Sequence, residues 1–217
     1  MRTLSDLNEG HLDLLKTRFE EIKSYVMTAA CEGRPAHEVE LGLWRRVLAM
    51  GHQALGLFFA LQGTGDVGDT LTLSDGRSVR RLEGLHERTY QSVFGSFTLR
   101  RTGYGSREGQ KVDCVPLDTR LQLPESEFSY LLQDWDQALA VENPYNKVND
   151  VLEKVLGVSQ SVDSLERMNR QMAEAVSPFQ AEKPIPPPEE EGAILVVSAD
   201  AKGVPIRRER DAPAIVD

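Results

Sequence analysis

The residue whose type and position best suit chemistry is Asp200, which follows a short apolar stretch near the end of the chain. Residues 194–197 are four consecutive apolar residues, mostly β-branched, and this predicts a buried strand. Residues 201–203 predict a turn, and residues 204–208 predict a returning strand. A carboxylate at the end of a buried strand can bind magnesium, but it can equally open an ordinary hairpin turn. From these residues alone, the ordinary turn is the favoured interpretation.

A second group of residues suited to chemistry is a set of arginines within a predicted β region. Residues 70–82 predict a hairpin about a Ser-Asp-Gly turn, and residues 88–101 alternate as two strands about Gly95. The arginines that we single out as DNA contacts are Arg88, Arg100 and Arg101. A basic sheet with interleaved aromatics can follow DNA phosphates, and an ordinary solvated face explains the same pattern equally well. Asp118 follows a proline, and we interpret it as a turn or cap residue.

The third group lies in a predicted pair of helices joined by the turn Leu156-Gly157-Val158-Ser159. In the second of these helices, Leu165 and Met168 predict the buried side. The exposed polar side chains that we expect to meet DNA are Gln160, Ser164, Arg167 and Arg170. This arrangement is typical of a helix-turn-helix, whose second helix reads base edges, and an ordinary helical hairpin remains the alternative.

These groups must be positioned by a chain that is mainly α-helical with a small antiparallel β module, an α+β fold. Amphipathic periodicity predicts helices at residues 5–31 and 36–61, and a further helix opening at Pro124. Glycines inside the second helix predict close packing of another helix. We expect the side chains of Leu43, Phe58, Phe59, Leu131, Trp135 and Leu152 to be buried.

The predicted regions follow one another in five segments. They are a helical region (1–62), a small basic β module (63–123), a helix-turn-helix-like region (124–181), a Pro/Glu linker (182–192) and an isolated hairpin (193–217). We expect the linker and hairpin to contribute little to the stability of the preceding helices.

Composition limits the classes of function. The net charge of −9 over 217 residues argues against a wholly basic nucleic-acid coat, although it allows a local basic face. The two cysteines are far apart and form no zinc or disulfide pattern, and His37 and His52 fit surface or packing roles. With no signal peptide pattern and no long apolar run, we expect a cytoplasmic protein with no membrane partner.

The residues around Asp200, read as VVSADAKGVPIRR, resemble the first-aspartate segment of Kra-type and related Lre-type insertion-sequence DDE transposases. The family pattern there is V-x-x-D-G-K-G-V-P-x-R, and Ala201 stands where the pattern usually has glycine. The stretch from Arg88 to Tyr104, followed by Pro116-Leu117-Asp118 and Leu121-Gln122-Leu123-Pro124, is also similar to the region before the catalytic domain in this family.

The resemblance implies a DNA-binding front part of a transposase, which ends at the start of an RNase H-like catalytic domain. It makes Asp200 the first catalytic aspartate and one ligand of a two-Mg²⁺ site in the complete family, whose second Asp and Glu we expect this chain to lack. We therefore expect no catalysis by this chain alone. The expected partner is transposon-end double-stranded DNA, with a homo-oligomer or a missing catalytic half left open. The alternative is a non-catalytic helical protein-interaction or DNA-binding remnant.

Overall fold

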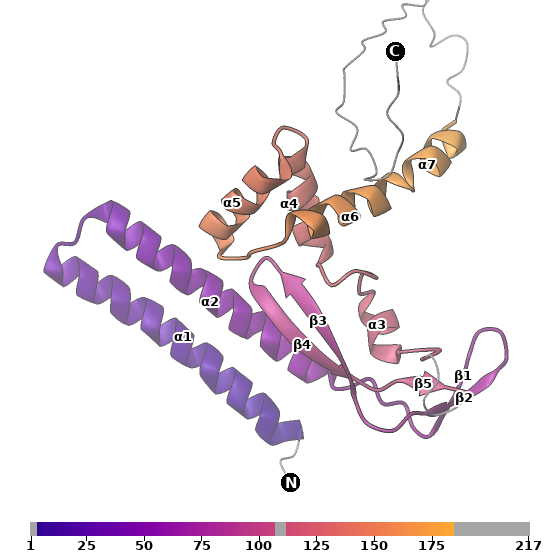
Figure 1. Cartoon of the computed structure of the whole chain (residues 1–217). Helices are drawn as coiled ribbons and strands as arrows, with labels where there is room; N and C mark the ends of the chain where they lie inside the picture. Colours follow the sequence, from indigo (N-terminus) through magenta and orange to yellow (C-terminus); the bar gives the residue numbers. More distant parts are fainter. Residues whose placement is uncertain (1–3, 107–111, 185–217) are drawn as a thin grey trace, which may run out of the picture. The chain divides into compact units, whose positions relative to one another are not determined.

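The computed structural model describes residues 4–106 and 112–184, with side chains from Gly10 onward, so the hairpin predicted around Asp200 and most of the predicted linker lie outside the described residues. The elements, in chain order, are α1 (Leu4–Glu32), α2 (Ala36–Gln62), β1 (Thr70–Thr72), β2 (Ser78–Arg81), β3 (His86–Ser92), β4 (Gly95–Arg101), β5 (Tyr104–Gly105), α3 (Pro116–Leu121), α4 (Tyr130–Ala140), α5 (Tyr145–Leu156), α6 (Val162–Ala173) and α7 (Val176–Glu182). The described chain is mainly helical with a small antiparallel β module, as the sequence predicts (Figure 1).

The chain divides into two compact units, residues 1–175 and residues 176–217. In the second unit the described structure is the short helix α7, which the sequence did not predict, and its side chains are exposed. The remaining elements belong to the first unit. None of the helices in the described ranges is both long and apolar enough to cross a membrane.

Helices α1 and α2 form an antiparallel hairpin, confirming the first two predicted helices (Figure 1). Gly33 takes a φ of 63° after the end of α1, and Pro35 precedes the start of α2. Near the closed end, the Tyr25 hydroxyl donates to the Glu38 carbonyl at 3.1 Å, and the Arg46 guanidinium lies 3.7 Å from the Tyr25 ring centroid. Among the described side chains of both helices, only that of Ala29 is buried.

The β module contains two small antiparallel sheets, and both predicted hairpins are present. One sheet has the strand order β1-β2-β5, with Leu71 opposite Val79, and the other pairs β3 with β4. In the second sheet, Thr89 lies opposite Thr98, and Gly95 takes a φ of 113° where the chain enters β4. Such a φ strains any residue with a Cβ, which explains the glycine at this turn.

Helix α2 packs on the β3–β4 hairpin through aromatic rings. His52 stacks on Phe97 with ring centroids 4.3 Å apart, and Phe59 meets Phe97 edge to face at 5.3 Å. The predicted close packing of another helix is confirmed at Gly42, where a Cβ would clash with the Tyr25 ring of α1. At Gly51 the close neighbour is not a helix, because a Cβ there would lie 2.5 Å from the Phe94 ring in the β3–β4 turn. His52 has a packing role.

The helix predicted from Pro124 begins later, at Tyr130. The residues before it are used in backbone pairing with β3: the Gln91 amide donates to the Glu127 carbonyl at 2.7 Å, and the Ser129 amide donates to the Gln91 carbonyl at 2.8 Å. Ser129 then caps α4 by accepting from the Leu132 amide at 3.2 Å. The buried residues of α4 are Leu132, Gln133 and Asp136.

Of the six apolar residues that we expected to be buried, Leu152 is buried, Leu43 and Phe59 are half-buried, and the other three are exposed. These three are Phe58, Leu131 and Trp135. Apolar spacing identified the helices correctly, but it did not show which part of each apolar stripe another element covers.

Candidate nucleic-acid interface

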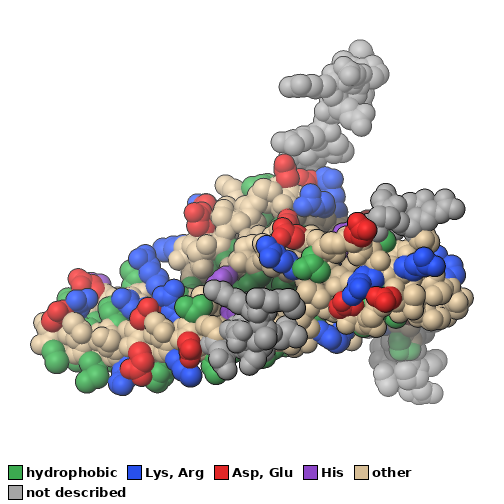
Figure 2. All heavy atoms as spheres, turned by 90° about the horizontal axis from the view of Figure 1, so that it is seen from below, with side chains coloured by type: hydrophobic (Ala, Val, Ile, Leu, Met, Phe, Trp, Pro, Cys, Tyr) green, Lys and Arg blue, Asp and Glu red, His purple; other side chains and the backbone are tan. Residues whose placement is uncertain are grey.

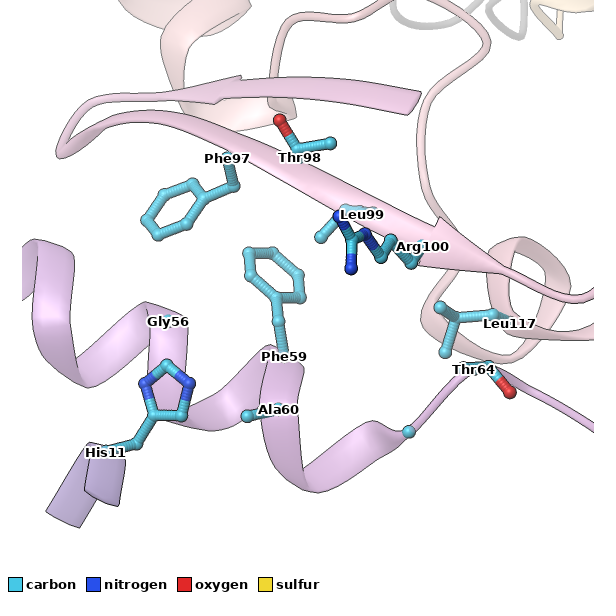
Figure 3. A pocket seen from close by; sticks show the side chains of 11 residues that line it. His11, Gly56, Phe59, Ala60, Thr64, Phe97, Thr98, Leu99, Arg100 and Leu117 are labelled. Atoms are coloured by element: carbon cyan, nitrogen blue, oxygen red, sulfur yellow. The ribbon is translucent and has the colours of Figure 1, made fainter. Parts of the chain in front are cut away.

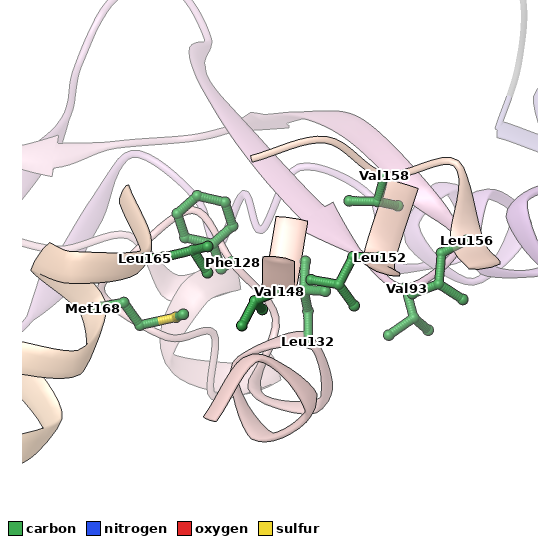
Figure 4. Packing of buried hydrophobic residues seen from close by; sticks show 9 residues of the cluster. All are labelled: Val93, Phe128, Leu132, Val148, Leu152, Leu156, Val158, Leu165 and Met168. Carbon is green, nitrogen blue, oxygen red and sulfur yellow. The ribbon is translucent and has the colours of Figure 1, made fainter. Parts of the chain in front are cut away.

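Helices α4, α5 and α6 form a three-helix unit around one apolar core. The core residues point toward one another from all three helices and from the β3–β4 turn (Figure 4). They are Val93, Phe128, Leu132, Val148, Leu152, Leu156, Val158, Leu165 and Met168. This core fixes the orientation of α6 relative to α5.

The connection from α5 to α6 is a tight turn. Gly157 takes a φ of 70° at the end of α5, and its amide donates to the Glu153 carbonyl at 2.9 Å. Ser161 begins α6 as its N-cap, because its hydroxyl accepts from the Ser164 amide at 3.0 Å. Helix, turn and capped helix are therefore where the sequence predicts them, which is compatible with both a helix-turn-helix and a helical hairpin.

One predicted site residue, Gln160, is buried, which corrects the prediction that its side chain is exposed. Its backbone amide donates to the Asn149 side-chain oxygen at 2.8 Å, and its side-chain nitrogen donates to both carboxylate oxygens of Asp136, at 3.1 and 2.9 Å. The turn before Ser161 directs this side chain into the bundle, where it holds α4 to the connection between α5 and α6. In this position Gln160 is structural and does not reach a base edge.

The partner of Gln160, Asp136, is completely buried in α4. Burial raises the pKa of its carboxyl from 3.8 to about 6, and the hydrogen bond from Gln160 opposes part of this rise. The Gln160 side-chain oxygen has no hydrogen-bond partner in the described structure. The hydrogen bonds from the Gln160 amide nitrogen favour the ionised carboxylate, but burial favours the neutral carboxyl and has the larger effect on the pKa.

The exposed side of α6 carries the other predicted contacts. Arg167 and Arg170 are exposed, whereas Ser164 is half-buried and its hydroxyl lies 2.8 Å from that of Ser161. Arg170 forms an ion pair with Glu166 one turn earlier. The two arginines lie in a shallow groove whose lining residues are Asp163, Glu166, Arg167, Arg170, Gln171 and Glu174. The surface is therefore of mixed charge rather than basic.

Two predicted DNA contacts of the β module, Arg88 and Arg101, are engaged inside the fold. Both donate to Asp118, Arg88 at 3.0 Å, and their side chains are only 15% and 13% exposed. Arg88 also donates to the backbone carbonyls of Pro124 and Ser126. These contacts tie the β3–β4 sheet to α3 and to the segment before α4, and so give both arginines a structural role.

Asp118, which we interpreted from the sequence as a turn or cap residue, is also the shared counter-charge of this network. It lies in the first turn of α3 and accepts hydrogen bonds from both arginines. In the register of β3 with β4, Arg88 is opposite Leu99 and Arg101 is opposite His86, so the two arginines occupy diagonal positions on neighbouring strands. The alternation of side chains along the two strands could have placed both arginines on one face of the sheet, and so indicated that an acidic residue lies beside them. It could not have indicated which carboxylate, because Asp118 is distant in sequence.

The third arginine singled out in the β module, Arg100, remains accessible. Its side chain is 70% exposed and pairs with Glu87 across the hairpin at 3.1 Å. The other exposed arginines nearby also have acidic partners: Arg77 pairs with Asp75, and Arg81 with Asp66 and Asp69. Local acids thus neutralise much of the basic character that we predicted for the module.

A pocket lies where α2 faces β4 (Figure 3). Phe59, Phe97 and Leu99 project into it, and His11 of α1 and Arg100 lie at its boundary. The lining is mainly apolar. Within residues 10–106 and 112–184, no three His, Cys, Asp or Glu side chains come together in a way that could hold a metal ion. Asp200, the predicted catalytic residue and metal ligand, lies outside the described residues.

No protein-family model, curated protein or solved structure matches this chain. A functional assignment therefore depends on the geometry of α6 and on the sequence patterns described above.

Proposed function

We propose that this chain is the DNA-binding front portion of a DDE transposase and that it uses α6 to recognise the end of an insertion sequence. The observation that carries the proposal is the division of α6 into two sides. Leu165 and Met168 are buried in the three-helix core, whereas Arg167 and Arg170 are exposed on a helix whose start is fixed by a capped turn. A helix held in this way can enter a major groove, with arginine side chains suited to guanine.

The β module supports α6 in this proposal rather than forming the main contact surface. Gln91 of β3 donates to the Ser159 carbonyl at 3.1 Å, and Arg88 binds the segment that leads into α4. The accessible Arg100 supplies a candidate phosphate contact, since phosphate contacts position a protein on DNA without reading sequence.

The acids beside the two arginines predict selective rather than strong non-specific binding. Asp163, Glu166 and Glu174 line the same groove, and the chain carries a net charge of −9. Repulsion between these acids and phosphates opposes non-specific binding, and the ion pair between Arg170 and Glu166 must open before Arg170 reaches a base. Affinity for unrelated DNA should therefore be low.

The magnesium-dependent part of the proposal is carried by the resemblance around Asp200 alone. In the complete family, two metal ions stabilise charge on the attacking and leaving oxygens of phosphodiesters. Asp200 would be one ligand of such a site.

The proposal can be tested by selecting bound sequences from a pool of randomised double-stranded DNA with the full chain, and then measuring binding by fluorescence anisotropy. Replacing Arg167 and Arg170 together with alanine should weaken binding to the selected sequence by about 1–3 kcal/mol for each arginine that reads a base. The wild-type affinity should fall as salt rises, because bound phosphates release counterions.

A matched control removes two exposed arginines away from α6. The Arg34→Ala/Arg77→Ala protein has the same net charge as the α6 variant, and both residues form ion pairs with nearby acids. It should bind the selected DNA like the wild type. If no sequence is enriched, or if both double variants lose affinity equally, α6 is not a recognition helix, and the alternative function of a helical protein-interaction domain is favoured.

A further inference from the structure

The α1–α2 hairpin carries an apolar surface on the side that the rest of the described chain leaves open. We name this surface the hairpin face, and its most exposed members are Leu12, Phe19, Val26, Val47, Phe58 and Leu61. In Figure 2, hydrophobic side chains lie among charged ones along the left-hand, helical part of the molecule. The side chains of the hairpin face are between 38% and 57% exposed.

The spacing within α1 separates the hairpin face from the contact with α2. Half-buried or buried residues recur at His11, Leu15, Arg18, Ile22, Tyr25 and Ala29, and this row packs against α2. Leu12, Phe19 and Val26 lie one position further along and repeat every seven residues. A seven-residue apolar repeat is the pattern by which one helix packs against another. Helix α1 thus carries a second helix-packing row in addition to the one that α2 uses.

The hairpin face is continuous across both helices. Leu12, Leu15 and Phe19 of α1 line one shallow apolar groove with Met50 and Ala54 of α2. The exposed fractions of its large side chains leave on the order of 500 Å² of apolar surface in water, which is near the upper end of what monomeric proteins expose. It would supply more than half of the roughly 800 Å² that each partner buries in a standard interface.

The charges beside this surface identify a partner. Asp13, Lys16, Glu20 and Lys23 form one row along the outside of α1, as shown by the ion pairs of Lys16 with Asp13 and of Lys23 with Glu20, each at 3.1 Å. The row alternates in sign. An identical row running in the opposite direction pairs every acid with a base, whereas a parallel copy in register pairs like with like.

We infer that the hairpin face is the dimer interface between two copies of this chain, with the two α1 helices antiparallel about a two-fold axis near the middle of α1. The acid-base row then meets itself with complementary charges, as a two-fold interface requires. The apolar rows of the two copies cover each other in a four-helix layer. Intrahelical ion pairs at exposed positions contribute little, so exchanging them for contacts between copies costs little.

The first experiment measures the mass of the full chain by analytical ultracentrifugation over a wide range of concentration. The wild type should be a dimer in equilibrium with monomer. Phe19→Asp should weaken the dimer at least tenfold, because it places a carboxylate at the centre of the hairpin face. The matched control, Leu14→Asp, alters an equally exposed α1 residue that is outside the hairpin face, and it should leave the dimer intact.

The second experiment tests the antiparallel arrangement and does not depend on how Phe19→Asp folds. The Lys16→Glu/Lys23→Glu protein makes the row wholly acidic, and the Asp13→Lys/Glu20→Lys protein makes it wholly basic. Each should be monomeric alone, and an equimolar mixture should form a heterodimer. A monomeric wild type, equal dimerisation of the Phe19 and Leu14 variants, or a mixture that remains monomeric would each overturn the inference. The outcome is independent of DNA binding, so it is separate from the test of α6.

Discussion

The three-helix unit of α4–α6 and the α1–α2 hairpin are built from similar amphipathic helices, but they differ in burial. The first encloses a core in which Leu132, Val148 and Leu165 are completely buried, and the second buries only Ala29 among its described side chains. In the three-helix unit, a third helix and the β3–β4 turn close the apolar stripes. In the hairpin, α1 packs on α2, and α2 also packs on the β3–β4 sheet, but the described elements leave the hairpin face of both helices open. The comparison shows that apolar periodicity predicts a helix, whereas burial depends on the number of elements that meet.

The largest difference in unfolding free energy should be between removing a mostly buried charge and removing an exposed one. Asp118→Ala leaves the guanidiniums of Arg88 and Arg101 without their carboxylate in a mostly buried site, and it should reduce the free energy of unfolding by about 3–5 kcal/mol. The matched change in the hairpin is Glu21→Ala, which breaks an exposed ion pair with Arg18 and should cost at most about 1 kcal/mol. Urea unfolding measures both. Equal losses would mean that the Asp118 network contributes no more than a surface ion pair.

Core truncation should give the next largest difference. Leu132→Ala removes a completely buried side chain from the centre of the three-helix core and should cost about 2–5 kcal/mol. Leu14→Ala in α1 makes the same chemical change at an exposed position and should shift stability by no more than about 0.5 kcal/mol. Thermal unfolding monitored by circular dichroism can compare the two. A large loss for Leu14→Ala would show that α1 is covered by another element.

Asp136 adds a dependence on pH to the stability of the three-helix unit. Its pKa of about 6 in the folded state lies above the ordinary 3.8, so the folded protein retains a proton between these values that the unfolded chain releases. The stability that Asp136 contributes is therefore greatest below about pH 4 and falls by about 3 kcal/mol as pH rises through 6.

Asp136→Asn removes this loss because the amide stays neutral. It should raise the free energy of unfolding at pH 7 by about 2–3 kcal/mol relative to the wild type, and change it little at pH 4. Asp13→Asn in α1, an exposed acid, is the control. Urea midpoints at the two pH values measure the effect. A pH-independent difference between Asp136→Asn and wild type would contradict the raised pKa.

The smallest expected effect concerns the division of the chain. Residues 1–175 form one compact unit, so deleting residues 176–217 should leave its melting temperature nearly unchanged. Differential scanning calorimetry of both lengths measures this. A fall of several degrees would show that the second unit packs on the first and contributes to its stability.

The sequence predicted the longer helices and the two β-hairpins well, because amphipathic spacing and the turns at Gly95 and Gly157 act over short distances. It did not predict α3, α7 or the pairing of β5 with β2. It predicted the candidate site less well. Arg88, Arg101 and Gln160 resemble surface contacts in sequence, yet each is paired with a carboxylate contributed by another element, Asp118 or Asp136. Polar residues of this kind can be assigned to the surface or the interior only when the three-dimensional neighbour is known. The start of α4 was missed for a similar reason, since pairing with Gln91 of β3 holds the preceding residues in an extended conformation.

One contact links the two regions compared above. The indole nitrogen of Trp44 in α2 donates to the Val155 carbonyl at the end of α5 at 2.6 Å, and the ring is 42% exposed. Trp44 is one of only two tryptophans in the chain, and the other, Trp135, lies in α4. Replacing Trp135 with phenylalanine would leave Trp44, at the junction, as the single tryptophan of the chain. Its emission wavelength would then report separation of the hairpin from the three-helix unit, independently of the loss of helical structure seen by circular dichroism.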